Sequence, residues 1–235
     1  MGKVATSSIS SAMRKAGLPV HHIHSLDDDH LLKMAKRSIS EGRFPAPHIC
    51  ESMAWKERLF SKPELCLYIS LVREPIARNL SGFFENARNL LTGHPSEWEP
   101  EEVLDVFVKR YKHTIPLDWF DREFEAQLGI NIYEQKFDPQ EKYVELSRHN
   151  TVIFRSDCDD KIAARVLSEA LERTIIVGRA NDTSNKPYSN IYRAVQRIAK
   201  FPKPFIDSMY DTKYVRHFWS DEEINVFRKK WQRPD

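Results

Sequence analysis

The feature that most constrains the fold is an apolar run that ends abruptly in a cation. Residues 67–72 read Leu-Tyr-Ile-Ser-Leu-Val, and Arg73, Glu74 and Pro75 follow directly. Such a run is typical of a short parallel strand covered on both faces, and the proline then resets the backbone toward a helix. The arginine adds a planar fork of hydrogen-bond donors at this strand end. The segment therefore predicts a strand–helix junction that binds an anion.

The predicted helix after this junction, residues 76–91, carries a hydroxyl eight residues beyond the arginine. This side chain, Ser81, can add a donor to the same anion. Two other interpretations stay open. Arg73 can form a structural ion pair with Glu74 or Asp157, and Ser81 can be an ordinary polar position on a helix.

Composition sets broad limits on the function. The chain has 235 residues, 41% of them hydrophobic, and a formal net charge of +2. This balance argues against a nucleic-acid binder that relies on bulk charge. Cys50, Cys66 and Cys158 fit no zinc spacing. No apolar run approaches the roughly 20 residues of a membrane helix, and no secretory signal is visible. If the N-terminus is native, a cytoplasmic location is favoured.

Strands and helices alternate along the sequence, which predicts one α/β domain over residues 1–235. We expect a three-layer sandwich with a mostly parallel sheet of four or five strands and ligands at the carboxyl ends of the strands. The predicted strands are residues 20–26, 67–72, 151–155 and 174–177. The predicted helices are residues 9–16 closed by Gly17, 31–39 capped by Asp27 or Asp28, 76–91, 101–112, 118–128, 160–171, 188–200 and 221–231 capped by Ser220.

A second motif, Lys-Val-Ala-Thr-Ser-Ser-Ile, occupies residues 3–9. Small residues let backbone amides approach an oxyanion, and the lysine, the hydroxyls and the following helix start add positive potential. The motif lacks the glycines of a Walker A loop. Taken alone, a hydroxyl-rich stretch of this kind is more often plain loop. A phosphate loop normally follows a buried strand, so we expect that a first strand before Lys3 is missing or truncated.

Taken together, the two motifs resemble those of sulfotransferases that use 3′-phosphoadenosine 5′-phosphosulfate. The match at the first motif covers Arg73, Pro75, Arg78, Ser81 and the pair Phe83-Phe84. The resemblance implies a P-loop nucleotide-hydrolase-like fold in which Arg73 and Ser81 hold the 3′-phosphate. Arg78 is either a helper on the same helix or an exposed cation.

The second motif resembles the 5′-phosphosulfate loop of the same family. The resemblance implies that Lys3 contacts the bridging and sulfuryl oxygens. It also implies that Ala5, Thr6, Ser7 and Ser8 bind the 5′-phosphate. The implied cofactor is 3′-phosphoadenosine 5′-phosphosulfate, and no metal is required.

Sulfuryl transfer to a hydroxyl needs a base, and histidine suits this role near neutral pH. Sulfotransferases place the base just before the strand of the 3′-phosphate arginine, where His48 lies here and Glu51 is a substitute. His24, in a cluster with His21 and His22, is a rival base. The cluster could also be a metal site, but three histidines at this spacing cannot all face one way on a strand.

The C-terminal part completes the resemblance. Residues 119–121, 129–133, 181–188, 217–220 and 229–231 resemble segments of sulfotransferase-like proteins described as putative capsular polysaccharide synthesis proteins. By position, Lys186 could meet a phosphate or an anionic acceptor with Tyr188 packed on it, or the loop could be solvent-exposed. The stripe of Trp119, Phe120 and Phe124 favours a place in the core over an acceptor platform.

The predicted function is transfer of a sulfuryl group to a hydroxyl, with a carbohydrate as the favoured acceptor. In this mechanism His48 removes the acceptor proton and Lys3 stabilises the departing bisphosphate. A nucleotide-dependent kinase is one alternative, although the Walker glycines and an obvious magnesium aspartate are missing. A non-catalytic protein with a role in polysaccharide synthesis is the other.

Overall fold

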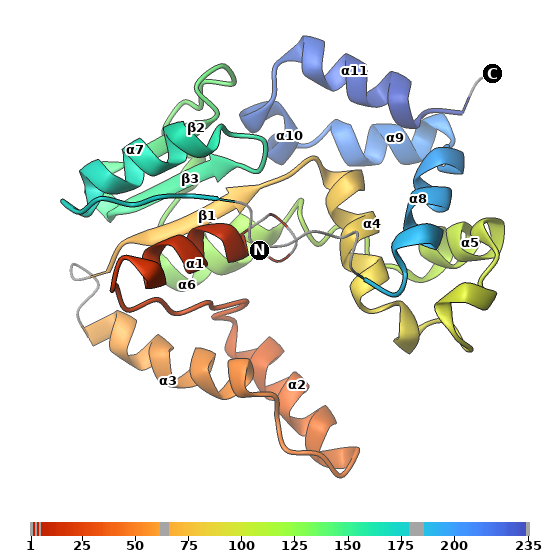
Figure 1. Cartoon of the computed structure of the whole chain (residues 1–235), viewed down its shortest axis with the longest axis horizontal. Coiled ribbons are helices and arrows are strands. Elements are labelled where there is room, and N and C mark those ends of the chain that lie inside the picture. Colours follow the sequence, from red (N-terminus) through yellow and green to blue (C-terminus); the bar gives the residue numbers. More distant parts are fainter. Residues whose placement is uncertain (1, 3, 5, 62–65, 179–185, 234–235) are drawn as a thin grey trace. The chain divides into compact units, whose positions relative to one another are not determined.

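The structure is a computed structural model that describes residues 2, 4, 6–61, 66–178 and 186–233 (Figure 1). These residues group into two compact units. Unit 1 comprises Met1–Val72 and Asp118–Gly178, and unit 2 comprises Arg73–Leu117 and Arg179–Asp235. Each unit is described by itself.

Unit 1 contains a three-stranded mixed sheet. Its strands are β1 (Tyr68–Val72), β2 (Tyr143–Leu146) and β3 (Thr151–Arg155), in the order β1-β3-β2. β1 and β3 are parallel, whereas β2 and β3 are antiparallel. All five residues of β3 are buried, as expected for a central strand.

One edge of β1 carries no strand from the described residues. The N–H of Tyr68 donates to the carbonyl of Asn150, and the carbonyl of Val72 accepts from Ser156. Peptide groups of a strand point alternately to its two sides, so those of Ile69 and Leu71 point away from β3. β1 therefore has a central-strand sequence and an open edge.

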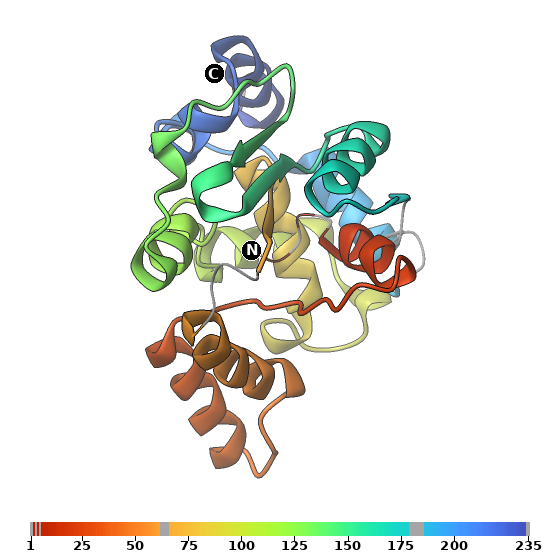
Figure 2. The ribbon, with the colours of Figure 1, turned by 90° about the vertical axis from the view of Figure 1, so that its left-hand side faces the viewer.

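Helices surround this sheet within unit 1. In Figure 2, α7 and α1 lie on one side of the strands, and the π-helical turn with α6 lies on the other. α2 and α3 pack against each other as a helical hairpin. The bounds are α1 (Thr6–Lys15), α2 (Asp28–Ser40), α3 (Pro47–Ser61), a π-helical turn (Asp121–Glu125), α6 (Ala126–Leu128) and α7 (Asp160–Ala170).

Unit 2 is helical in its described residues. Its core is aromatic, since Phe83, Phe107, Tyr210, Tyr214 and Trp231 are almost completely buried. None of the helices in the described part of the chain combines the length and hydrophobicity needed to cross a bilayer. The bounds are α4 (Pro75–Glu85), α5 (Pro100–Arg110), α8 (Ser189–Ile198), α9 (Lys203–Tyr210), α10 (Lys213–Phe218) and α11 (Asp221–Trp231).

Local end signals placed several helices correctly. The Asp27 side chain accepts from the N–H of His30 at the start of α2. Ser220 forms a capping box at the start of α11. After α1, Gly17 takes a positive φ of 77° and donates to the carbonyl of Arg14, which ends the helix as the sequence predicted.

Two predicted strands are wrong. Residues 20–26 form a loop, because the Ser25 hydroxyl and the Leu26 N–H donate to the buried Glu123 carboxylate at 2.7 and 2.6 Å. Residues 174–177 also lie outside the sheet, where the N–H of Ile175 donates to the Ser168 hydroxyl of α7. The chain is thus mixed α/β, with three strands in its described part instead of four or five. Prediction also missed β2, α3, α9 and α10.

Candidate functional site

The predicted 5′-phosphate loop leads into α1 in unit 1. Lys3 and Ala5 lie outside the described residues. Thr6, Ser7 and Ser8 form the first turn of the helix, and all three are half-buried. This turn contains no acidic residue. The helix dipole places positive potential at this turn, and this potential favours an anion.

A histidine fixes the first of these hydroxyls. Thr6 Oγ1 lies 3.0 Å from His22 Nε2. The Ser10 hydroxyl donates to the Thr6 carbonyl at 3.0 Å. Burial lowers the pKa of His22, and positive charge nearby, including that of Arg14, acts in the same direction. The neutral ring can donate from Nε2 to Thr6 and leave the threonine hydroxyl hydrogen for a ligand.

Three histidine rings lie in succession from this point. The rings of His22 and His24 are 4.7 Å apart, and those of His24 and His48 are 5.6 Å apart in an edge-on arrangement. His48 is exposed near the start of α3, and Glu51 is exposed on the same helix. The structure thus brings together the two histidines predicted as candidate bases, and it adds His22 as their link to Thr6.

His21 belongs to a different surrounding. Its ring packs on Trp55 with centroids 3.5 Å apart, and burial lowers its pKa. Among the residues that the structure describes, no group of three or more histidine, cysteine, aspartate or glutamate side chains is arranged to hold a metal ion.

A cavity of about 770 Å³ adjoins this histidine row within unit 1. The open edge of β1 forms one wall, and Thr6, His22 and His24 lie on the cavity surface. The hydroxyl of Ser70 is buried, with 2% of the residue exposed, and has no hydrogen-bond partner among the residues that the structure describes. Trp119 and Phe124 line the cavity and are themselves buried with Phe120, which confirms their predicted place in the core.

In unit 2, the predicted 3′-phosphate arginine has a fixed backbone. The Tyr214 hydroxyl accepts from the N–H of Arg73 at 3.2 Å and donates to its carbonyl at 2.9 Å. Arg73 is half-buried immediately before α4, and Ser81 is half-buried about two turns into this helix. The motif therefore holds its predicted positions at a strand–helix junction.

The residue after the arginine closes the start of α4. The Glu74 carboxylate accepts from the N–H groups of Ile76 and Ala77, both at 2.8 Å. The Tyr210 hydroxyl and the Trp231 indole N–H also donate to it. Burial raises the pKa of Glu74, while these hydrogen bonds oppose the shift. Glu74 thus joins α4 to α9 and α11.

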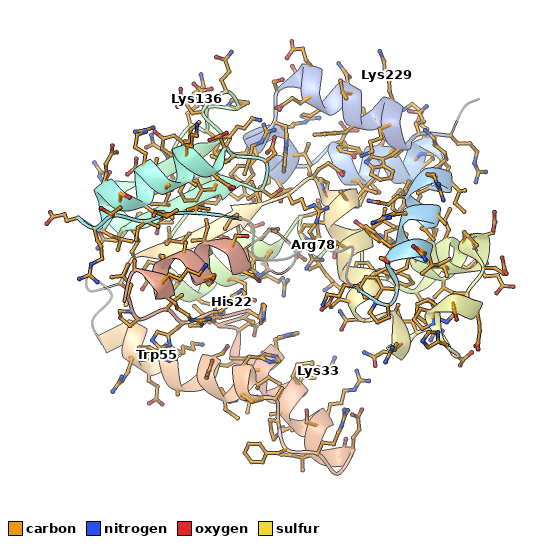
Figure 3. All side chains as sticks on the ribbon, viewed as in Figure 1. His22, Lys33, Trp55, Arg78, Lys136 and Lys229 are labelled. Atoms are coloured by element: carbon orange, nitrogen blue, oxygen red, sulfur yellow. The ribbon has the colours of Figure 1, made fainter. Side chains whose placement is uncertain are left out.

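Arg78, labelled on α4 in Figure 3, is not an exposed cation, since only 7% of the residue is exposed. Its guanidinium donates to Tyr111 Oη at 3.0 Å and to Asn79 Oδ1 at 3.1 Å. Gly82 permits this contact, because a Cβ there would collide with the Tyr111 hydroxyl. The described contacts of Arg78 are structural ones within unit 2.

Lys186 meets a carboxylate of its own unit. Its Nζ lies 3.6 Å from Glu85 Oε1, and the Tyr188 hydroxyl donates to Glu85 Oε2 at 2.6 Å. Burial, with the nearby carboxylate, raises the pKa of Tyr188. The Tyr188 ring packs on Phe84 at 5.7 Å. The predicted phosphate or anionic acceptor beside Lys186 stays a prediction, and in the structure Lys186 pairs with Glu85.

Sequence reasoning missed two residues beside the first turn of α1. The sequence suggested His22 only as a member of a histidine cluster, and it suggested no role for Arg14. The helical spacing of Ser7, Ser10 and Arg14 is a signal that could have placed them on one face of α1. No family model, no curated protein and no solved structure matches this chain.

Proposed function

We propose that this protein is a sulfotransferase, which moves a sulfuryl group from 3′-phosphoadenosine 5′-phosphosulfate to a hydroxyl of a carbohydrate. The observation that carries the proposal is the row of side chains that begins at α1. Thr6 lies in the first turn of α1, its hydroxyl contacts His22, and the rings of His22, His24 and His48 follow in succession. One unit thus supplies an oxyanion cradle and two candidate bases.

The proposed reaction is an in-line displacement at sulfur. The acceptor oxygen forms a bond to sulfur as the bond from sulfur to the bridging phosphate oxygen breaks. His48 takes the acceptor proton, and adenosine 3′,5′-bisphosphate leaves. Thr6, Ser7 and Ser8 bind the 5′-phosphate, and Lys3 neutralises charge on the bridging oxygen. Most of the rate enhancement then comes from positioning and preorganised charge.

The proposed 3′-phosphate site is Arg73 with Ser81. The double hydrogen bond from Tyr214 supports this assignment, because it holds the arginine backbone in one place. A guanidinium with a fixed backbone loses less conformational freedom when it binds a phosphate. Lys186 becomes a further contact if it exchanges Glu85 for this phosphate.

The fold that we propose is the three-layer, P-loop-like sandwich. The edge of β1 that no described strand covers supports it, because β1 is apolar apart from Ser70 and the Tyr68 hydroxyl, and the adjoining cavity offers space for a further strand. A crystal structure with a further strand paired to β1 would fit the proposal. A crystal structure with a helix against that edge would contradict it.

Isothermal titration with adenosine 3′,5′-bisphosphate tests the function. We expect a Kd on the order of 1 µM and a loss of about tenfold or more in Arg73→Ala. Lys33→Gln removes an exposed cation of α2 and should leave the affinity unchanged. Preferential binding of ATP with magnesium would replace the proposal with a kinase. Absence of binding to either nucleotide would leave a non-catalytic role.

The base has its own test. His48→Ala should abolish sulfuryl transfer and leave the affinity for the bisphosphate nearly intact, because a base contributes about 10²–10⁴-fold to the rate and nothing to donor binding. His24→Ala and Glu51→Gln are the matched variants. Full turnover in His48→Ala would contradict its assignment, and loss in His24→Ala alone would transfer the role to His24.

A further inference from the structure

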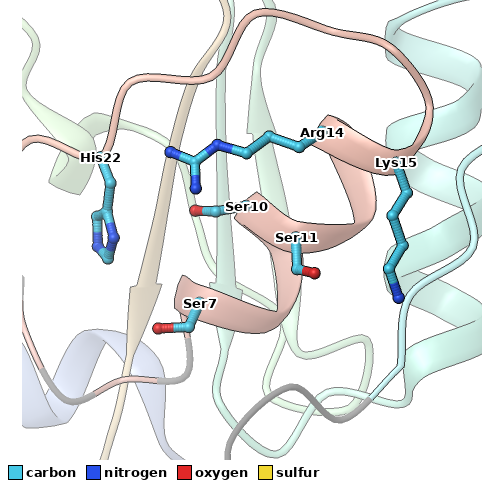
Figure 4. A pocket seen from close by; sticks show the side chains of 6 residues that line it. All are labelled: Ser7, Ser10, Ser11, Arg14, Lys15 and His22. Atoms are coloured by element: carbon cyan, nitrogen blue, oxygen red, sulfur yellow. The ribbon is translucent and has the colours of Figure 1, made fainter.

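A small polar pocket lies along one side of α1 (Figure 4). Its volume is about 360 Å³. One helix supplies nearly all of the wall, and the loop after it supplies the remainder. The lining residues are Ser7, Ser10, Ser11, Arg14, Lys15 and His22.

The spacing of these residues explains why they share a wall. Ser7, Ser10 and Arg14 stand three and four residues apart, so they follow one face of the helix. Figure 4 shows the Arg14 guanidinium extending toward Ser10 and His22. His22 faces this stripe from the loop, where its hydrogen bond with Thr6 fixes the ring.

The chemical character of the pocket is cationic and rich in donors. Three hydroxyls, a guanidinium, an ammonium and an imidazole line it, and no carboxylate belongs to the lining. Arg14 Nη2 donates to the Val20 carbonyl at 3.2 Å, which orients the guanidinium and uses one of its five N–H donors. The side chain of Ser10 is small, 8% of the residue is exposed, and its hydroxyl donates to the Thr6 carbonyl. It therefore fills little of the pocket.

We propose that this pocket is a binding site for an oxyanion, a phosphate or sulfate group, held by Arg14, Ser7 and His22. Arg14 offers N–H groups to two oxygens of the anion, and the Ser7 hydroxyl donates to another. In its other neutral tautomer, His22 accepts from Thr6 at Nε2 and donates its Nδ1–H to the anion from the opposite side. The inference goes beyond the proposed function and does not rest on it, since these residues are outside the predicted donor contacts except for Ser7.

The same oxyanion can come from two sources. It can be a phosphate of the nucleotide, since the pocket shares Ser7 with the predicted 5′-phosphate loop. It can equally be a sulfate or phosphate group on the acceptor, since His22 contacts His24, one of the candidate bases. Competition with the nucleotide distinguishes the two.

The experiment titrates the protein with inorganic sulfate and, separately, with phosphate at constant ionic strength, and follows the His22 ring signals by NMR. A saturable shift with a Kd of roughly 1 mM is expected. Arg14→Gln should weaken it about tenfold and Ser7→Ala about threefold, because a charge-assisted hydrogen bond is stronger than a neutral one. Lys33→Gln serves as the control and should change nothing.

The outcomes separate this site from the proposed function. Saturable binding that adenosine 3′,5′-bisphosphate displaces assigns the oxyanion to the donor. Binding that persists beside the bisphosphate assigns it to the acceptor. Sulfate binding without any bisphosphate binding sustains the site and overturns the sulfotransferase. A linear, non-saturable shift, or equal binding in Arg14→Gln, overturns the site itself.

Discussion

Two helix starts in this protein solve the same electrostatic problem in opposite ways. In the first turn of both α1 and α4, the backbone N–H groups have no acceptor within the helix itself. At α4 the protein supplies its own anion, the buried Glu74 carboxylate, which accepts from Ile76 and Ala77. At α1 the first turn carries hydroxyls and no acidic residue. The first arrangement stabilises the fold, and the second leaves capacity for an external anion.

The contrast refines how each start can take part in nucleotide binding. At α4 the carboxylate occupies the helix amides, so a 3′-phosphate there must be held by side chains such as Arg73 and Ser81. At α1 the positive helix start and hydroxyls such as that of Ser7 would bind a phosphate. Anion affinity at α4 should therefore depend on single side chains, whereas affinity at α1 should be spread over many weak donors.

The largest effect on stability is expected at α4, when the Glu74 carboxylate at the helix start is removed. Glu74→Gln replaces a carboxylate that accepts from four groups with an amide whose NH₂ faces donors. We expect the free energy of unfolding to fall by about 3 kcal/mol, because buried N–H and O–H groups lose their acceptor. Urea denaturation measures it.

Glu57→Gln is the matched control, because Glu57 is exposed on α3. Its free energy of unfolding should stay within about 0.5 kcal/mol of wild type. An equal and small change in both variants would show that Glu74 does not anchor α4.

A smaller effect is expected two turns into the same helix. Gly82→Ala should gain about 0.5–1 kcal/mol in helix propensity but lose more, about 1–3 kcal/mol, because the added Cβ collides with the Tyr111 hydroxyl. In a Tyr111→Phe background the collision disappears and the same substitution should become neutral or stabilising. Denaturation of the four proteins gives the cycle. Destabilisation of equal size in both backgrounds would contradict the collision.

The sequence predicted those features that depend on neighbouring residues. Gly17, Asp27 and Ser220 mark helix ends because their partners lie within a few positions. The apolar runs at residues 67–72 and 151–155 also correctly predicted the strands β1 and β3. Burial of Arg78 was not, because it depends on Tyr111, 33 residues away. A local pattern cannot show whether a distant side chain will accept or cover a charge.

The loop at residues 20–26 shows the same limit at the candidate site. The segment was predicted as a strand, but at its end the Ser25 hydroxyl and the Leu26 N–H donate to Glu123, about 100 residues later in the chain. A partner so distant in the sequence leaves no local signal. The contact between His22 and Thr6 likewise joins residues that no local pattern links.

At α1 the expected effect on stability is smaller than at α4. Thr6→Val removes one half-exposed hydrogen bond with His22 and keeps the shape of the side chain. We expect a loss of only about 0.5–1 kcal/mol in unfolding free energy. Affinity for adenosine 3′,5′-bisphosphate should fall about threefold to tenfold, because the valine offers no hydroxyl.

Thr6→Ser retains the hydroxyl and is the control, with affinity close to wild type. If Thr6→Val lost as much stability as Glu74→Gln and kept its affinity for the bisphosphate, the proposed difference between the two helix starts would be wrong.

The smallest expected effect is on how the free energy of unfolding depends on pH. The sign of this dependence differs between His22 and Glu74. The folded-state pKa of His22 lies below 6.5. The unfolded state therefore binds more protons between the two values, and stability rises with pH up to about 6.5. Burial is the main cause of this lowered pKa, and the charge of Arg14 acts in the same direction. For Glu74 the folded-state pKa lies above 4.5, so the folded state binds more protons and stability falls as pH rises above 4.5.

Unfolding free energies across a pH series isolate each slope by difference from wild type. His22→Gln should remove a rising component below about pH 6.5, and Glu74→Gln should remove a falling component that begins near pH 4.5. A His22→Gln protein that loses more stability than wild type on acidification would contradict the lowered pKa. Slopes of opposite sign would show that burial disfavours the carboxylate form of Glu74 at α4 and the protonated form of His22 beside α1.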